Sequence, residues 1–256
     1  MKADLGSYRL VLFDLDGVLT PTADIHMHAW KVMFTQLFAE KGVTSPYTDE
    51  DYYLYLDGKK RDDGVASLLA SRGIAVPLGH PDDPTSSDTV WGIGNRKNDV
   101  FTAVLEQDGI APYPGSLELV DQLLAAGMPM GVVSSSKNAV WVLKAAGLSD
   151  KFTVVIDGVV AADEGLASKP APDMFLAGAA HFGILPSEAV VFEDAISGVA
   201  AAHAAQFSLV VGVDRGAGEQ ALREAGADIV IDDLAELVAK SPQSTERGRR
   251  EPNEES

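Results

Sequence analysis

Short apolar runs alternate with longer amphipathic stretches along most of the chain. The first run, Tyr8–Phe13, is built mainly from Leu, Val and Phe. An apolar run of this length is typical of a strand covered on both faces, as in a parallel sheet. Five later runs have the same character and are predicted to be strands, at residues 129–133, 153–156, 189–192, 208–213 and 228–231.

Helical patterns fill the gaps between these predicted strands. They cover residues 116–126, 138–146, 172–182, 195–205 and 218–225. Regular alternation of strands and helices favours an α/β fold in which helices cover both faces of a parallel sheet. The sequence therefore predicts a Rossmann-like, doubly wound core.

The stretch after the first strand has a different pattern. It holds amphipathic helical patterns at 26–41, 62–72 and 98–108 but no strand pattern, and residues 79–94 have the composition of a long loop. We expect residues 22–106 to form a helical cap inserted into a core made of residues 1–21 and 107–239. The polar residues 240–256 are predicted to be a disordered tail.

Composition narrows the possible functions. The 256 residues include no cysteine, which excludes disulfides, thiolate metal sites and cysteine nucleophiles. The formal charge of −18, from 38 acidic and 20 basic residues, disfavours binding to nucleic acid or to an anionic membrane surface. The sequence contains neither an apolar run of ~18 residues nor a signal-peptide pattern. We therefore expect a cytoplasmic protein.

Candidate chemistry follows the predicted strands. Ligands of open α/β sheets bind beyond the carboxyl ends of the strands. The polar residues at these points are Asp14, Asp16, Ser134, Lys169, Glu193 and Asp194. Clustered carboxylates repel one another unless a hard cation lies between them, and oxygen ligands suit Mg²⁺. A Mg²⁺ ion and a lysine would together neutralise a phosphoryl group, so the pattern indicates phosphoryl transfer.

The same residues resemble the four motifs of the haloacid dehalogenase-like phosphotransferases. The motifs are Phe13–Val18, Ser134, Lys169–Asp173 and Glu193–Asp194, in this order. The chain resembles in particular the β-phosphoglucomutase-like family. That resemblance rests on Thr22–His26, Ala29–Trp30, Asp57–Arg61, Arg96–Asp99, Tyr113–Gly115 and Ser136–Asn138.

The resemblance implies roles for the residues at the strand ends. Asp14 would be the nucleophile that forms an aspartyl phosphate, and Asp16 would be the general acid–base. Ser134 and Lys169 would bind the transferring phosphoryl group. The metal ligands would be the Asp14 carboxylate, the Asp16 backbone carbonyl, Glu193 and Asp194.

Substrate-binding residues are implied in the same way. Arg61 from the cap would hold the non-transferring phosphate together with Ser136, Lys137 and Asn138. His26 would lie near the hinge, and Lys97 would reach down from the cap. Gly58 and Trp30 complete the implied set, although Trp30 also fits the interior of the cap.

The resemblance implies a monomeric phosphomutase that converts β-glucose 1-phosphate into glucose 6-phosphate through a bisphosphate. Two alternatives stay open. One is a phosphatase of small phosphosugars that uses the same machinery with water as the acceptor. The other is a non-catalytic protein that binds a sugar phosphate. The segments 79–94 and 158–168 are longer than the family pattern requires, which leaves the identity of the sugar open.

Overall fold

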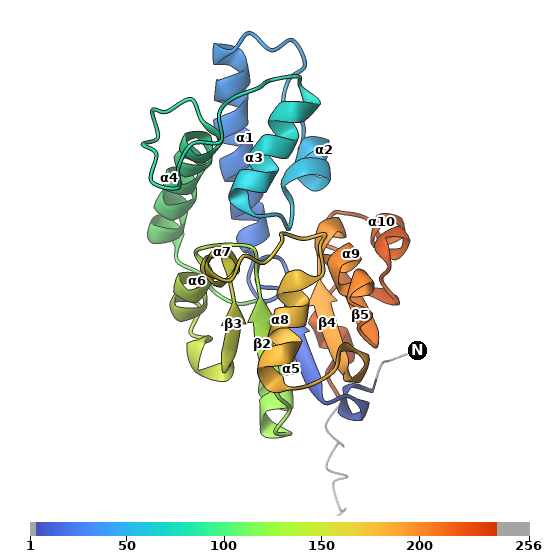
Figure 1. The fold of residues 1–256 in the computed structure, drawn as a ribbon. Helices are drawn as coiled ribbons and strands as arrows, with labels where there is room; N and C mark the ends of the chain where they lie inside the picture. Colours follow the sequence, from blue (N-terminus) through green and yellow to red (C-terminus); the bar gives the residue numbers. More distant parts are fainter. Residues whose placement is uncertain (1–3, 240–256) are drawn as a thin grey trace, which may run out of the picture.

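A six-stranded parallel sheet forms the centre of the molecule in the computed structural model, which describes residues 4–239 (Figure 1). The strand order is β3-β2-β1-β4-β5-β6. Each predicted apolar run contains one strand, so the expected sheet is confirmed. The strands are β1 Leu10–Phe13, β2 Met130–Val133, β3 Val154–Ile156, β4 Ala189–Glu193, β5 Leu209–Val213 and β6 Ile229–Ile231.

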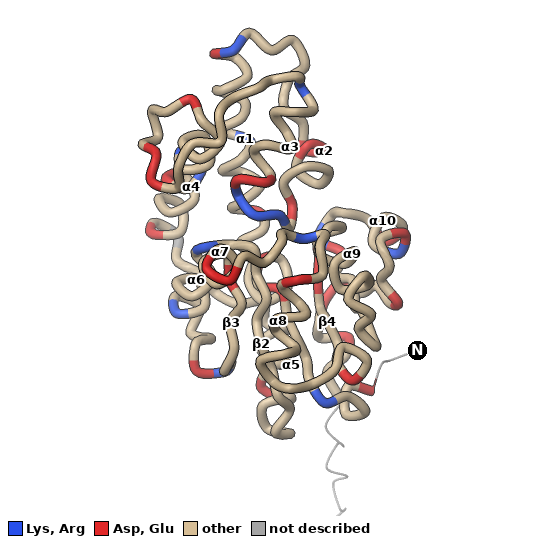
Figure 2. Tube along the Cα trace, viewed as in Figure 1, with Lys and Arg blue, Asp and Glu red and all other residues tan. Residues whose placement is uncertain are grey.

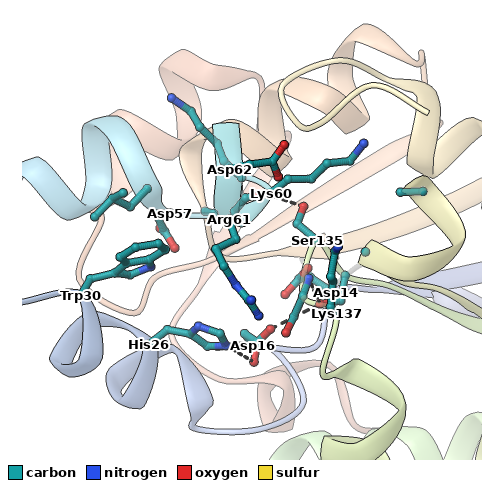
Figure 3. Close-up of a pocket in the computed structure, with 18 of the residues that line it drawn as sticks. Asp14, Asp16, His26, Trp30, Asp57, Lys60, Arg61, Asp62, Ser135 and Lys137 are labelled. Carbon is teal, nitrogen blue, oxygen red and sulfur yellow. Dashed lines mark hydrogen bonds and ion pairs between the residues drawn. The ribbon is translucent and has the colours of Figure 1, made fainter. Parts of the chain in front are cut away.

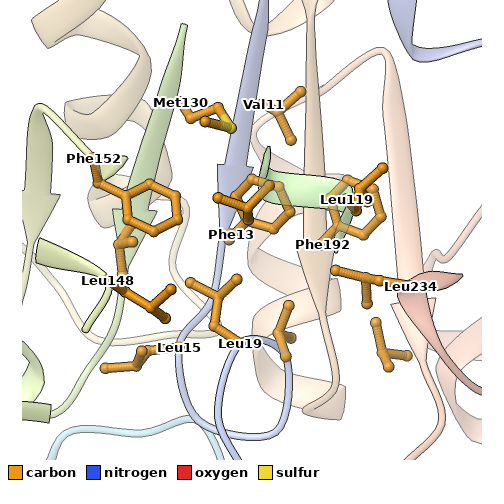
Figure 4. Close-up of a cluster of buried hydrophobic side chains, with 14 of the residues drawn as sticks. Val11, Phe13, Leu15, Leu19, Leu119, Met130, Leu148, Phe152, Phe192 and Leu234 are labelled. Atoms are coloured by element: carbon orange, nitrogen blue, oxygen red, sulfur yellow. The ribbon is translucent and has the colours of Figure 1, made fainter. Parts of the chain in front are cut away.

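Helices cover both faces of this sheet. Val11 and Phe13 of β1 point to one face, where Phe13 stacks on Phe192 at a centroid distance of 5.0 Å (Figure 4). Leu10 and Leu12 belong to a second buried cluster, which confirms the doubly wound arrangement. The helices of the core are α5 Pro114–Ala125, α6 Ala139–Ala145, α7 Gly158–Asp163, α8 Asp173–Phe182, α9 Ile196–Ala204 and α10 Glu219–Ala225. Short 3₁₀ turns lie at Leu5–Ser7, Ser149–Lys151, Pro186–Glu188 and Leu234–Leu237.

The helices between β1 and α5 lie above the carboxyl ends of the strands and are called the helical block below (Figure 1). They pack around their own apolar cluster, which includes Phe34, Leu68 and Ile93. The block therefore has a core separate from those of the sheet. Its elements are α1 Thr22–Glu40, α2 Asp49–Asp51, a π-helical turn Tyr52–Leu56, α3 Arg61–Ser71 and α4 Val90–Asp108.

Two expectations about local structure were wrong. Helix α4 begins at Val90 rather than at Asn98, so part of the predicted loop 79–94 is helical. The Thr89 side chain caps the helix and Val90 and Ile93 are buried, and this packing outweighs the weak helix propensity of the nearby glycines. Helix α7 lies in the segment 158–168, for which no helix was predicted.

The predicted disordered tail, residues 240–256, lies outside the described residues. Within residues 4–239, no helix has both the length and the hydrophobicity needed to cross a bilayer.

Candidate active site

A cavity of about 370 Å³ lies between the strand ends and the helical block (Figure 3). Asp14 directly follows β1, Ser134 follows β2, Glu193 ends β4 and Asp194 follows it. Figure 2 shows the basic segment that precedes α3 facing acidic positions at the strand ends. The predicted site residues that line the cavity are Asp14, Asp16, His26, Trp30, Gly58, Arg61, Lys97, Ser134, Ser136, Lys137, Glu193 and Asp194.

Lys169 lies beneath the cavity and joins two of its carboxylates. Its Nζ donates to Asp14 Oδ1 and to Glu193 Oε2, both at 2.7 Å, and to the backbone carbonyl of Val133 at 3.2 Å. Burial opposes the charge on Lys169, but the two carboxylates outweigh burial and raise the pKa of its ammonium group. The ammonium therefore stays charged and holds both acidic side chains in place.

Three buried carboxylates form a group that could hold a cation. Asp14, Glu193 and Asp194 each offer an oxygen, and these oxygens lie within 4.8 Å of one another. Burial raises the pKa of Asp194 well above its usual range, and the nearby charges of Asp57 and Glu193 raise it further. A divalent cation would relieve this repulsion, and an all-oxygen donor set suits a hard ion. The group therefore fits a divalent metal.

The Asp16 carboxylate is held apart from this group. Thr22 Oγ1 donates to its Oδ1, Ser134 Oγ donates to its Oδ2 at 3.3 Å, and His26 Nε2 lies 3.5 Å from Oδ1. Burial raises the pKa of Asp16, but the charge and hydrogen bond of His26 and the hydrogen bond from Thr22 outweigh it and lower the pKa to about 2. Asp16 is thus anionic at neutral pH in this arrangement.

His26 connects Asp16 to Lys97. Lys97 Nζ contacts His26 Nδ1 and lies 4.5 Å from the ring centroid of Phe101 and 5.1 Å from that of Trp30. Burial and the charge of Lys97 lower the pKa of His26 to about 4, so the imidazole is neutral at pH 7. Trp30 therefore both lines the cavity and packs in the helical block, as the sequence analysis allowed.

Arg61 extends from the start of α3 into the cavity (Figure 3). Its Nη2 donates to Asn98 Oδ1 at 2.7 Å, and Asn138 Nδ2 donates to the same oxygen at 2.9 Å. Asn98 of the helical block thereby joins Arg61 to the loop after β2. In that loop the Lys137 ammonium lies 4.6 Å from the ring centroid of Trp91. Arg61 and Lys137 form a second cationic region of the cavity.

The segment Asp57–Lys60, between the π-helical turn and α3, is docked on the core by three serines. Ser197 Oγ donates to the carbonyl of Asp57 at 2.7 Å, and Ser135 Oγ donates to that of Gly58 at 2.6 Å. The Lys60 N–H donates to Ser168 Oγ at 2.8 Å. Gly58 has a φ of +69°, and a Cβ at this position would lie only 2.4 Å from Ser197 Oγ. Both features require glycine. The helical block is therefore closed over the strand ends.

Sequence reasoning missed several residues that the structure places in or beside the cavity, among them Asp57, Trp91, Asn98 and Ser135. Asp57 and Asn98 lie inside segments that the family resemblance singled out, but they were given no role. Trp91 lies in the segment that was predicted to be a loop. Of the predicted residues, Lys169 and Asn138 do not line the cavity, but both hydrogen-bond to residues of the site.

A model of the haloacid dehalogenase-like hydrolase family matches residues 8–206. The chain belongs to this family. The match spans the segment from Asp14 to Asp194, which supplies most of the residues that line the cavity. The protein is therefore an enzyme of phosphoryl transfer. Enzymes of this family generally use a divalent metal, and the three buried carboxylates could hold one.

The chain is also similar to named proteins and solved structures. The chain is 48% identical over 239 residues to a β-phosphoglucomutase of Mycobacterium tuberculosis (strain CDC 1551 / Oshkosh), covering 90% of this chain and 91% of that one. The crystal structure of a β-phosphoglucomutase from Clostridium difficile is similar, with a TM-score of 0.70, 25% identity and coverage of 90% and 93%. CbbY from Rhodobacter sphaeroides in complex with xylulose-(1,5)bisphosphate is also similar, with a TM-score of 0.69, 25% identity and coverage of 90% and 96%.

Proposed function

We propose that this protein is a β-phosphoglucomutase, which converts β-D-glucose 1-phosphate into glucose 6-phosphate through the 1,6-bisphosphate. The observation that carries the proposal is a pair of cationic groups at the site, one directly beneath the cavity and one that lines it. Lys169 lies beside Asp14 at the strand ends, and Arg61 reaches in from the helical block. Two such groups suit a substrate that carries phosphate at both ends. The relative with 48% identity carries the same name.

Asp14 is the nucleophile in this proposal. Its carboxylate attacks the phosphoryl group, the bond from phosphorus to the sugar oxygen breaks, and an aspartyl phosphate forms. Lys169, held at 2.7 Å from Asp14, would neutralise charge on the transferring oxygens. Ser134 follows the neighbouring strand and would donate to the same group.

Asp16 moves the proton. It would protonate the departing sugar oxygen in the first half-reaction and remove the proton from the attacking hydroxyl in the second. Thr22 and His26 orient the Asp16 carboxylate. The low pKa of Asp16 in the present arrangement corresponds to its anionic form, which accepts the proton of the attacking hydroxyl in the second half-reaction.

Magnesium is the metal that we propose for the group formed by Asp14, Glu193 and Asp194. When bound there, it would supply positive charge against the oxygens of the phosphoryl group. The Asp16 backbone carbonyl would complete the protein ligands.

The helical block, residues 22–108, would act as a cap that excludes water while the bisphosphate turns over. A phosphomutase needs such exclusion because water competes with the sugar hydroxyl for the aspartyl phosphate. The docking of Asp57–Lys60 on Ser135, Ser168 and Ser197 supports a closed site. The second candidate is a phosphosugar phosphatase, which is favoured by the match to a family of hydrolases.

One assay separates the two candidates. Purified protein is incubated with β-glucose 1-phosphate, Mg²⁺ and a trace of glucose 1,6-bisphosphate, and glucose 6-phosphate and free phosphate are measured together. A mutase forms glucose 6-phosphate at the rate at which substrate disappears. Release of free phosphate at that rate, without glucose 6-phosphate, would contradict the proposal and identify a phosphatase.

A further inference from the structure

Arg215 follows β5 and contacts three other segments at the edge of the site. Its Nε donates to the backbone carbonyl of Gly17 at 2.9 Å, and its Nη1 donates to that of Asp232 at 2.8 Å. The guanidinium carbon lies 3.9 Å from the ring centroid of Tyr113. The aromatic ring and the two carbonyls together fix the plane of the guanidinium group.

Gly17 in turn lies directly against Asp194. Its φ is +86°, and a Cβ at this position would come within 1.8 Å of Asp194 Oδ2. The backbone of Gly17 therefore forms a wall on which the Asp194 carboxylate packs. Within its own turn this peptide is held by one bond, from the Gly17 N–H to the carbonyl of Thr20 at 2.8 Å. Arg215 provides the restraint from outside the turn.

Asp194 depends on that wall more than its neighbours do. Asp14 and Glu193 are each held by Lys169 at 2.7 Å. Within residues 4–239, the Asp194 carboxylate takes part in no ion pair and accepts no hydrogen bond, although it is buried. Its position among the three carboxylates is thus fixed by packing.

We propose that Arg215 is a positioning residue for the metal-binding group, because it holds the Gly17 wall on which Asp194 packs. The inference rests on the proposed metal-dependent function. Within residues 4–239, Arg215 forms no hydrogen bond or ion pair with Asp14, Glu193 or Asp194, so it acts through the backbone of Gly17.

An effect of the Arg215 charge and an effect of its positioning role would change the metal affinity in opposite directions when Arg215 is replaced. A cation near the site repels a divalent metal, so loss of the charge alone would tighten metal binding. Loss of an outer residue that orients a ligand weakens metal affinity by roughly 10–100-fold. The direction of the change in metal affinity therefore separates the two effects.

The experiment measures the Kd of Mn²⁺ by electron paramagnetic resonance for the wild type and for the variants Arg215→Met and Arg215→Lys. Arg223→Met is the matched control, since Arg223 pairs with Glu219 on the exposed face of α10. We expect the Kd to rise about tenfold or more in both Arg215 variants. The control should stay within about twofold, and saturating metal should restore most of the kcat that Arg215→Met loses.

Asp194→Asn tests the metal site independently of Arg215. If the wild type does not bind Mn²⁺, or if Asp194→Asn leaves its Kd unchanged, the proposed metal site is wrong and the inference fails with it. If Asp194→Asn weakens binding but Arg215→Met binds Mn²⁺ as tightly as the wild type or more tightly, only the inference is overturned. Circular dichroism checks that each variant folds. If Arg215→Met does not fold, the Kd of Arg215→Lys tests the inference instead, because lysine keeps the positive charge but not the planar guanidinium group.

Discussion

Lys169 Nζ lies 2.7 Å from Asp14 Oδ1 in a part of the core that is closed to solvent. The same ammonium lies 2.7 Å from Glu193. A single cation thus compensates both the proposed nucleophile and a proposed metal ligand. Removing either partner of such a buried arrangement leaves charge without compensation.

Lys169→Met is expected to lower activity by roughly 10²–10³-fold, since it removes a charge that stabilises the transferring phosphoryl group. It should also lower stability by about 3–5 kcal/mol, because two buried carboxylates lose their cation. Hydrolysis of p-nitrophenyl phosphate and thermal unfolding measure the two effects. Lys151→Met, at an exposed pair with Asp121, is the control. A variant with unchanged activity would remove Lys169 from the proposed mechanism.

Asp14→Asn should abolish turnover, with a loss of roughly 10³-fold or more, because an amide is a poor nucleophile. The exposed Asp63→Asn is the matched control and should keep wild-type rates. Mass spectrometry after rapid quenching checks the chemistry directly: phosphate should label the wild type and not the Asp14 variant. Retention of a tenth of the activity would mean that Asp14 is not the nucleophile.

Asp16→Ala should lower the rate on a sugar phosphate by roughly 10²–10⁴-fold, the usual effect of losing a general acid–base. The loss on p-nitrophenyl phosphate should be smaller, since its leaving group needs little protonation. Comparing kcat/KM for the two substrates measures the difference. Equal losses on both would count against proton transfer by Asp16.

Arg61→Ala should reduce conversion of β-glucose 1-phosphate by about 10²-fold and leave hydrolysis of p-nitrophenyl phosphate within about twofold. The physical reason is that only the bisphosphate route needs a grip on a second phosphate. Arg223→Ala controls for the loss of a surface arginine. If both activities fell together, Arg61 would be acting on the cap as a whole rather than on the second phosphate.

Asp57→Asn should make the stability of the protein less sensitive to a rise in pH from about 4 to 7. Burial raises the pKa of Asp57 from 3.8 to about 7, so the folded state binds more protons than the unfolded state between these values. Stability from this group is therefore complete below pH 4 and is lost as the pH rises to 7. The variant should gain on the order of 2–4 kcal/mol relative to wild type between pH 4 and pH 8. Urea unfolding with chelator present measures this gain. Asp63→Asn should show none, and an equal gain in both variants would contradict the assignment to Asp57.

The sheet and the acidic motifs could be predicted from the sequence because buried parallel strands leave uninterrupted apolar runs, and their ends meet at one edge. The start of α4 could not be predicted, since Gly92 and Gly94 weaken the helical pattern there, while the packing of Val90 and Ile93 stabilises the helix.

Contacts between segments that are distant in the sequence also could not be predicted from local sequence patterns. Nothing in the spacing of the serines indicates that Ser135 and Ser197 donate to the carbonyls of Gly58 and Asp57. The burial of Asp57 depends on the same docking, and its role was missed for that reason.

The docking of Asp57–Lys60 on the core has an evolutionary consequence. Each of the three serines bonds to the main chain of this segment rather than to a side chain. Side chains at Asp57 and Lys59 can therefore change under selection for a different sugar while the two halves of the enzyme still meet in the same way. Gly58 and Lys60 are the exceptions: the φ of Gly58 and its contact with Ser197 leave no room for a side chain, and Lys60 Nζ donates to the carbonyl of Leu166 in the core. Substrate range can thus diverge within this lineage at positions whose replacement leaves the closing contacts intact.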